Sequence, residues 1–294
     1  MGEITKIEWT ATRMPDGRVI PGATFNPWWG CVKVSPACEH CYAETMAKRF
    51  GHAVWGPAST TQRRFFKQKH WDEPFKWNAE CEAEGIQRKV FCASMADVFE
   101  DNDALTESRE LLLELIEATP RLVWLLLTKR PENILPMTER WMAGADADWP
   151  RNVWVGTTVE TQEYAEKRIP HLLKAPAPVR FLSCEPLLGQ VRLSKWLDNI
   201  SGLPPMGDWD GAPTTPTGWY QIADWEPGIE WVITGGESGP GKRFCDPDWM
   251  RSLRDQCQAA GVPFFMKQMD KVQPIPDDLL VREMPEMSSV VGAS

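Results

Sequence analysis

The 294-residue sequence has no apolar run approaching the roughly 20 residues that a membrane-spanning helix needs. It also lacks a recognisable signal peptide, so we expect a cytoplasmic protein that does not bind membranes. Positive charge is scarce: 32 Lys and Arg residues stand against 41 Asp and Glu residues, which gives a net charge of −9. This balance argues against binding of nucleic acid over the whole surface and leaves room only for local basic patches.

Paired metal-ligand motifs are scarce as well. Cys31, Cys38 and Cys41 are spaced C-x6-C-x2-C, but no second C-x2-C or H-x3-H pair occurs. Structural zinc usually takes four protein ligands, whereas a [4Fe–4S] cluster on three thiolates keeps one iron open for another ligand. We therefore favour an iron–sulfur cluster over a zinc site completed by His40 or His52, and a disulfide is disfavoured in reducing cytosol.

The three-cysteine motif resembles that of the radical S-adenosylmethionine (SAM) superfamily, although the usual spacing there is C-x3-C-x2-C. More closely, the chain resembles a phage and mobile-element family long labelled as of unknown function. The resemblance covers roughly residues 4–270. Four strings carry it: N-P-x-x-G-C at 26–31, T-K-R-P at 128–131, S-x-E-P-L-L-G at 183–189 and G-G-E-S-G-P-G at 235–241.

The resemblance implies a [4Fe–4S] cluster whose fourth iron binds SAM, and reductive cleavage of SAM to a 5′-deoxyadenosyl radical. It implies modification or rearrangement of a nucleobase in phage DNA hypermodification, for example isomerisation of an amino-acid adduct on thymidine. The implied partners are nucleic acid, with DNA favoured, or a modified nucleotide, and an electron donor such as flavodoxin or ferredoxin. Two alternatives stay open: a repair lyase or RNA-modifying enzyme with the same cofactors, and a non-enzymatic zinc-binding phage protein.

Alternating strand and helix patterns predict an α/β fold, a partial or near-complete TIM-like (β/α) barrel of about six to seven parallel strands, of the type that radical SAM enzymes use. A small hairpin precedes it. We expect one domain over residues 1–270, a Gly/Pro/Trp-rich insertion at about 201–227 and a loosely ordered tail at 271–294. The expected strands are 24–28, 89–95, 122–128, 152–158, 179–184, 230–234 and 262–267.

Polar residues follow nearly every predicted strand. In such barrels the chemistry lies at the carboxyl ends of the strands, and SAM needs acids, hydroxyls, a cation and bare backbone. Glu237 or Asp97 are candidates for the SAM ammonium, Lys129 or Arg130 for its carboxylate, and Glu185 for the ribose. No catalytic residue is assigned. The candidate cofactor-binding residues are Ser94, Asp97, Lys129, Arg130, Thr157, Glu160, Ser183, Glu185, Gly235, Gly236 and Glu237.

Basic and aromatic residues interleave over residues 52–78. This pattern suits contact with the backbone and bases of nucleic acid, and equally suits a helix with a solvated charged face. The candidate contacts are Arg63, Arg64, Lys67 and Lys69. A phosphate-binding loop at 236–242 is rejected, because Arg243 stands where Ser or Thr would bind Mg²⁺.

Overall fold

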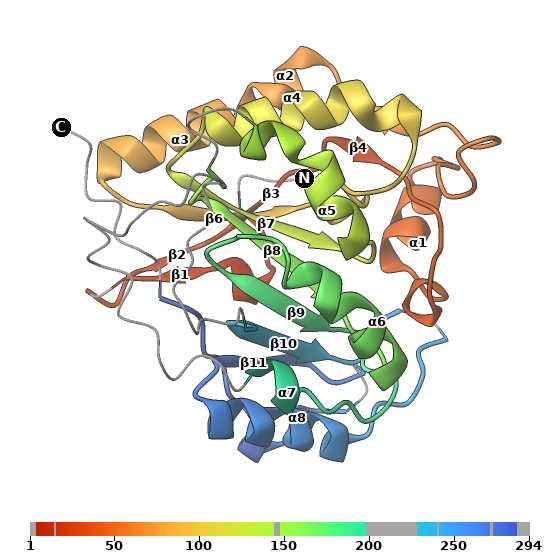
Figure 1. The fold of residues 1–294 in the computed structure, drawn as a ribbon, viewed down its shortest axis with the longest axis vertical. Helices are drawn as coiled ribbons and strands as arrows, with labels where there is room; N and C mark the ends of the chain where they lie inside the picture. Colours follow the sequence, from red (N-terminus) through yellow and green to blue (C-terminus); the bar gives the residue numbers. More distant parts are fainter. Residues whose placement is uncertain are drawn as a thin grey trace.

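The computed structural model describes residues 4–14, 16–143, 148–197, 228–239, 241–270 and 273–286. Its centre is a sheet of seven parallel strands that curls into a half-barrel (Figure 1). The α/β partial barrel predicted from the sequence is therefore confirmed. In spatial order the strands are β11 (Phe264–Gln268), β10 (Trp231–Gly235), β9 (Arg180–Cys184), β8 (Val153–Thr158), β7 (Leu122–Thr128), β6 (Arg88–Cys92) and β3 (Ala23–Thr24).

Helices wrap the convex face of this sheet (Figure 1). The longest of them shows how the sequence sets helix ends: the Asp246 carboxylate accepts a hydrogen bond from the Asp248 amide, and Gly261 closes the helix at φ 69°. No described helix is long and apolar enough to cross a membrane. The helices are α1 (Tyr42–Arg49), α2 (Gln68–Trp71), α3 (Glu73–Glu84), α4 (Thr106–Glu117), α5 (Ile134–Met137), α6 (Gln162–Leu172), α7 (Ser194–Leu197) and α8 (Pro247–Ala260).

The sheet is buried on both faces, which explains the unbroken apolar sequence of β7. Trp124 and Leu126 pack in the large cluster that includes the helices, whereas Val123 and Leu125 belong to a separate cluster on the other face. Trp9, from the 3-10 turn Glu8–Thr10, belongs to that second cluster. Its indole lies 4.8 Å from the Phe91 ring and 6.1 Å from the Trp231 ring, so the N-terminal segment fills the inside of the half-barrel.

A buried lysine also lies inside the half-barrel. Lys89 of β6 is 1% exposed, and its ammonium lies 5.2 Å from the Trp154 ring and 5.6 Å from the Trp231 ring. It donates to the Ala11 carbonyl at 3.4 Å. Burial lowers its pKa to about 8, because the charged form is the one that loses hydration.

The first strand differs from its prediction over residues 24–28. The strand in the main sheet is β3 alone, and the chain then leaves the sheet. Trp28–Trp29 forms β4, which pairs antiparallel with β5 (Arg64–Phe65) in a second small sheet. Between them Pro27 has no amide hydrogen to donate, and the Asn26 side chain instead accepts from the Met95 amide at 2.6 Å.

The predicted hairpin is present as β1 (Thr12–Arg13) and β2 (Val19–Ile20). The predicted insertion at 201–227 lies outside the described residues. Part of the tail differs from expectation: Met266 of β11 donates to the Val281 carbonyl at 2.8 Å, and Glu283 donates back to Phe264 at 2.9 Å. Residues 273–286 are thus tied to the edge of the sheet instead of being loosely held.

Candidate functional site

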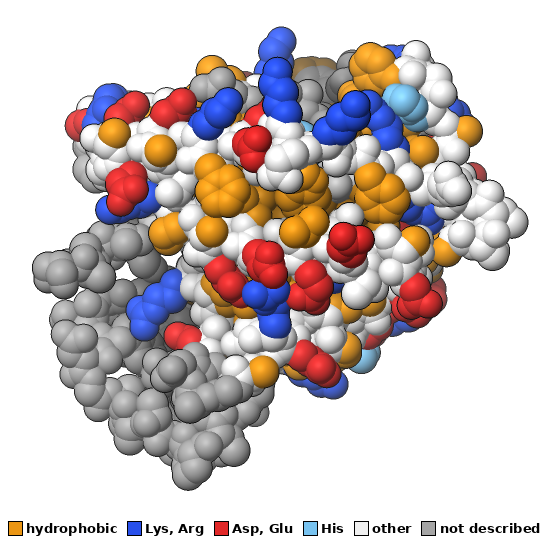
Figure 2. Space-filling model, turned by 90° about the horizontal axis from the view of Figure 1, so that it is seen from above, with side chains coloured by type: hydrophobic (Ala, Val, Ile, Leu, Met, Phe, Trp, Pro, Cys, Tyr) orange, Lys and Arg blue, Asp and Glu red, His pale blue; other side chains and the backbone are white. Residues whose placement is uncertain are grey.

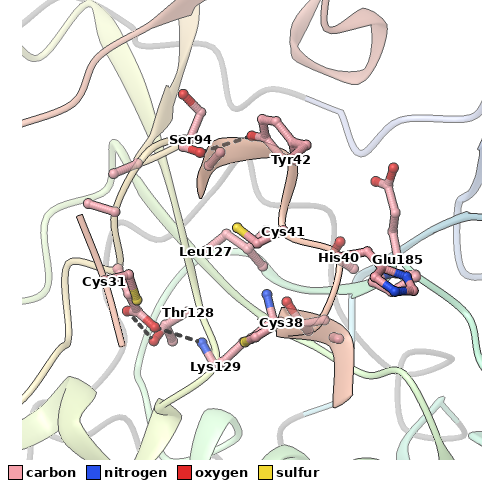
Figure 3. Close-up of a pocket in the computed structure, with 18 of the residues that line it drawn as sticks. Cys31, Cys38, His40, Cys41, Tyr42, Ser94, Leu127, Thr128, Lys129 and Glu185 are labelled. Atoms are coloured by element: carbon pink, nitrogen blue, oxygen red, sulfur yellow. Dashed lines mark hydrogen bonds between the residues drawn. The ribbon is translucent and has the colours of Figure 1, made fainter. Parts of the chain in front are cut away.

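One cavity lies at the carboxyl ends of the parallel strands (Figure 3). Each strand from β6 to β11, or the loop after it, contributes at least one polar side chain to its wall. Eight predicted cofactor-binding residues line it: Ser94, Asp97, Lys129, Arg130, Ser183, Glu185, Gly236 and Glu237. Thr128, Thr158 and Lys267, which also stand at the ends of predicted strands, line the wall too.

All three clustered cysteines line the same cavity. Cys31 follows β4, Cys38 ends the 3-10 turn Pro36–Cys38, and Cys41 is the residue before α1. Figure 3 shows Cys31 on one side of the cavity and Cys38 and Cys41 on the other. These three thiols are partly exposed, whereas the five other cysteines are buried. A reagent or cofactor in the cavity therefore meets these three thiols and none of the buried five.

Three soft donors, the thiols of Cys31, Cys38 and Cys41, face the cavity. Within the described ranges, no three His, Cys, Asp or Glu side chains converge as ligands of one ion. The His40 ring is hydrogen-bonded to Glu237 through Nδ1, which leaves Nε2 as its possible metal-binding nitrogen, whereas His52 lies edge-on to the Trp29 indole. The zinc alternative therefore stays open. In a [4Fe–4S] cluster each thiolate binds a different iron, so three sulfurs facing one cavity without meeting at a point suit it. Soft thiolates are the ligands that such clusters take.

Arg130 fastens the first cysteine to the end of β7. Its Nη1 lies 3.7 Å from the Cys31 sulfur and 2.7 Å from the Asp97 carboxylate, and its Nη2 donates to the Val32 carbonyl at 2.9 Å. Burial raises the pKa of the Cys31 thiol to about 12, and the Asp97 charge adds to this while Arg130 opposes it. A positive centre in the cavity would be needed to hold this thiol as a thiolate at neutral pH.

The role expected for Asp97 as a partner of the SAM ammonium is corrected. Its two oxygens accept four hydrogen bonds, one of them from the guanidinium of Arg130. The other donors are the Phe99 amide, the Thr128 hydroxyl and the Lys129 amide. A carboxylate has about four acceptor positions, so Asp97 is already satisfied and serves to position Arg130.

Glu237 and Arg243 fasten the other end of the cysteine loop. Glu237 accepts from the His40 ring at 2.9 Å and from both the amide and the guanidinium of Arg243. Arg243 also donates to the Glu39 carboxylate at 3.0 Å and to the Pro36 carbonyl at 2.9 Å. Burial of Glu237 opposes its ionisation, but the bonds from Arg243 and His40 outweigh it and hold its pKa below the usual value.

This network corrects the second predicted ammonium partner, because the Glu237 carboxylate holds the segment between Cys38 and Cys41. Sequence analysis missed Arg243 as part of the site, and it considered His40 only as the fourth ligand of a zinc ion. For Arg243 the only signal was its position just after the glycine-rich string.

A lysine and a glutamate meet across β10. Lys267 of β11 donates to both Glu185 oxygens, at 2.6 and 2.8 Å. The strand between them carries Gly235, where an added Cβ would lie 3.4 Å from the Glu185 carboxyl carbon. Gly235 was predicted to contact the cofactor directly, but it does not line the cavity. Its lack of a side chain leaves room for the Glu185–Lys267 pair.

Two other predicted cofactor residues lie away from the cavity. Thr157 is fully buried and donates to the Thr128 carbonyl at 2.9 Å. Glu160 is also fully buried, and it pairs with Arg168 at 2.7 Å. Successive side chains of β8 point to opposite faces of the sheet, so Thr158 lines the cavity although Thr157 does not. The buried hydroxyl of Thr158 has no hydrogen-bond partner among the described residues.

The basic stretch is only partly at the surface. The Arg63 side chain is 1% exposed and pairs with Glu100, whose side chain is equally buried. Arg63 therefore cannot contact a polymer, and its predicted role is wrong for this physical reason. Arg64 is half-buried, whereas Lys67 and Lys69 are exposed.

Comparison with known proteins gives one match. A family model described as "Protein of unknown function (DUF5131)" matches residues 4–284. No curated protein and no solved structure matches the chain. The assignment to the radical SAM superfamily drawn from the cysteine motif is wrong, because the family that matches is a different one. The motif's C-x6-C-x2-C spacing had already departed from the usual superfamily pattern.

Proposed function

The chain belongs to the DUF5131 family of proteins of unknown function, and we propose that it is an iron–sulfur enzyme that cleaves SAM. In this proposal Cys31, Cys38 and Cys41 hold a [4Fe–4S] cluster, and SAM binds in the adjoining cavity. The proposal rests on the site itself and not on any family assignment.

One observation carries the proposal. Three partly exposed thiols line a cavity whose remaining polar wall comes from the ends of six parallel strands. In (β/α) barrels this edge of the sheet is where substrates bind. Three thiols and several polar side chains facing one space support the binding of a soft metal cluster beside a polar organic cofactor.

The residues around the thiols act as positioning groups. Arg130 holds the Cys31 segment through Val32, and Asp97 fixes Arg130. Glu237 and Arg243 hold the segment that carries Cys38 and Cys41. When bound and reduced, the cluster would supply the electron that breaks the C5′–S bond of SAM, leaving methionine and a 5′-deoxyadenosyl radical.

Several wall residues suit the parts of SAM. The Lys129 ammonium has no carboxylate within ion-pair distance in the described part of the chain, so it suits the SAM carboxylate. The hydroxyls of Thr158 and Ser183 suit the ribose or the adenine. Trp9, Phe91 and Leu127 give the cavity an apolar side that would exclude water from a reactive intermediate.

The substrate that we propose is a nucleobase, modified or rearranged in nucleic acid or in a modified nucleotide, with DNA favoured. Isomerisation of an amino-acid adduct on thymidine in phage DNA is one such reaction. Each turnover that consumes SAM needs one electron from outside, so an electron donor of the flavodoxin or ferredoxin class is implied.

The deciding experiment is single-turnover cleavage of SAM. Protein reconstituted anaerobically with iron and sulfide would be mixed with SAM and dithionite, and 5′-deoxyadenosine measured by chromatography. We expect slow release without substrate, and none from protein lacking iron. Iron-loaded protein that leaves SAM intact would overturn the proposal. Mass spectrometry of nucleosides from DNA and RNA of expressing cells would then separate a DNA substrate from an RNA substrate.

A further inference from the structure

A row of aromatic rings lies beside the cysteine loop and reaches the surface at one end. The Phe50 ring lies 6.1 Å from the Trp29 indole, which lies 6.0 Å from the Phe66 ring. The Phe66 ring in turn lies 4.4 Å from the His70 ring. We call Phe50, Trp29, Phe66 and His70 the aromatic row. Its end is open to solvent, because Phe50 is 64% exposed.

One cation lies over the aromatic row, and three more adjoin it in the sequence. The Arg64 guanidinium lies 4.6 Å from the Trp29 ring and 5.0 Å from the Phe66 ring. Arg49, Lys67 and Lys69 are exposed, and none of the three has a carboxylate within ion-pair distance in the described ranges. Figure 2, which looks onto α2, α3 and α4, shows several Lys and Arg side chains along one edge of this face, away from its main group of acidic side chains.

Some arginines elsewhere on the chain are paired with acids. Arg140 lies within 3.4 Å of three glutamates, and Arg251 is bound by Asp248 and Asp278. On a protein with a net charge of −9, Arg49, Lys67 and Lys69 add a group of cations without ion pairs in the described part of the chain. Such a group has a strongly negative partner as its natural complement.

We propose that the aromatic row and its cations bind single-stranded nucleic acid and lead it to the cavity. Bases stack on exposed rings and on arginine planes, while lysines and arginines contact phosphates. Duplex DNA presents phosphates but hides the faces of its bases, so the exposed Phe50 ring favours a single strand. The inference rests on the proposed function in one respect: the bound strand is taken to be the substrate of the cavity.

The position of the row supports this path. α1 begins next to Cys41 at the cavity and ends next to Phe50 at the row. At 1.5 Å per residue this separation is about 14 Å, a span that a few nucleotides cover. A strand held along the row can thus present one base to the cavity while its neighbours stay bound.

The test measures binding by the full chain without cluster or SAM. A fluorescein-labelled oligothymidine of about 15 nucleotides would be titrated by anisotropy over a range of salt concentrations. We expect the variant Arg49→Ala/Lys67→Ala/Lys69→Ala to bind more weakly, with a log–log salt slope flatter by about 2, since each single-strand contact contributes about 0.7. Phe50→Ala should weaken binding about tenfold by removing a stacking surface.

A matched control has the same change of charge. Arg140→Ala/Lys195→Ala/Arg251→Ala removes three cations that are paired with acids elsewhere, and it should keep both the affinity and the slope of the parent. The proposal is overturned if both triple variants weaken binding equally, if a duplex of the same length binds as tightly, or if nothing binds at low salt.

Two further outcomes distinguish this inference from an interface for an electron donor and from the proposed cleavage of SAM. If the Arg49/Lys67/Lys69 variant keeps oligonucleotide binding but is reduced more slowly by flavodoxin, the face serves an acidic electron donor and the nucleic-acid proposal falls. Because binding is measured without cofactors, its failure leaves SAM cleavage untouched. Failure of SAM cleavage, equally, leaves the binding result standing.

Discussion

The guanidinium of Arg130 lies 3.7 Å from the sulfur of Cys31, although 99 residues separate them in the chain. The same guanidinium forms a buried ion pair with Asp97 at 2.7 Å, in which both side chains are 8% exposed. The position of the first proposed cluster ligand therefore depends on an ion pair built at the ends of β6 and β7. Stability and cofactor binding are coupled at this point.

Removing Arg130 should destabilise the protein. Arg130→Ala leaves the Asp97 carboxylate buried without its cation, and breaking such a pair costs about 3 kcal/mol of unfolding free energy. Urea denaturation of protein without cofactor measures this change. Arg140→Ala is the control, because its partners are exposed and its loss should cost under about 1 kcal/mol. Equal effects of the two variants would contradict a special role for the buried pair.

The cysteines should differ sharply in their effect on iron. Reconstituted parent protein should hold about four irons per chain. Cys38→Ala should lose most of this iron, because it removes a thiol that lines the cavity. Cys257→Ala, whose thiol is buried on the inner side of α8, should keep it. Iron and sulfide analysis checks both, and stoichiometric zinc without iron in the parent would defeat the cluster assignment.

Glu237 should act on the cysteine loop and not on SAM directly. Glu237→Ala frees both His40 and Arg243, so we expect iron content to fall to about half or less. Arg243→Ala should have the same effect, and the double variant should lose little more because the two residues act as one unit. A Glu237→Ala protein with full iron and weakened SAM binding would restore the direct contact that the structure argues against.

Glu185 should affect SAM binding without affecting iron. Its carboxylate faces the cavity and is held by Lys267, away from the cysteine loop. Glu185→Gln keeps the shape but removes the charge, and we expect SAM affinity, measured calorimetrically, to fall about tenfold at unchanged iron content. Glu166→Gln is a control of the same chemistry, since that glutamate pairs with Lys195 on the surface. Unchanged affinity in Glu185→Gln would remove this residue from the binding site.

Lys89 gives a prediction about pH. Its pKa is lowered from 10.5 to about 8 in the folded protein, so the unfolded chain binds the proton more tightly. The buried charge therefore costs stability fully below pH 8, and this cost declines between about pH 8 and 10.5. Lys89→Met should stabilise the protein at pH 7 by a few kcal/mol, since one pKa unit corresponds to about 1.4 kcal/mol.

The gain from Lys89→Met should shrink when the same urea titration is repeated at pH 9.5. Lys195→Met, at an exposed position, should show no such trend. A gain that is independent of pH would mean that better packing, and not the removal of a buried charge, explains the stabilisation.

The sequence predicted the sheet well because a strand that is buried on both faces has a continuous apolar sequence. β7 was predicted with the bounds that the structure has, as an unbroken apolar run from Leu122 to Thr128. The start of the sheet was predicted less well. The aromatic sequence around Trp28 suits a strand, and nothing local shows that this strand pairs with Arg64 and Phe65 in place of the main sheet.

The sequence predicted where the site lies, but not which charged side chains pair with each other there. A polar residue after a strand of a parallel sheet must lie at the edge where the cavity forms, and most of the predicted residues do. The partner of each charged side chain comes from a distant part of the sequence. Arg63 meets Glu100, 37 residues away, and Glu237 meets His40, 197 residues away. No local sequence pattern indicates such pairs. The sequence therefore suggested an exposed Arg63 side chain and a Glu237 carboxylate that could bind a ligand.

The two arginines that fasten the cysteine loop also set an order of events during synthesis. The cysteines lie within the first 41 residues, but Arg130 and Arg243 leave the ribosome only much later. Until residue 243 has emerged, the loop is without one of its two anchors. In the proposed function, loading of a cluster onto these thiols would therefore follow the synthesis of residue 243, and a maturation factor would have to recognise a folded half-barrel and not a nascent peptide.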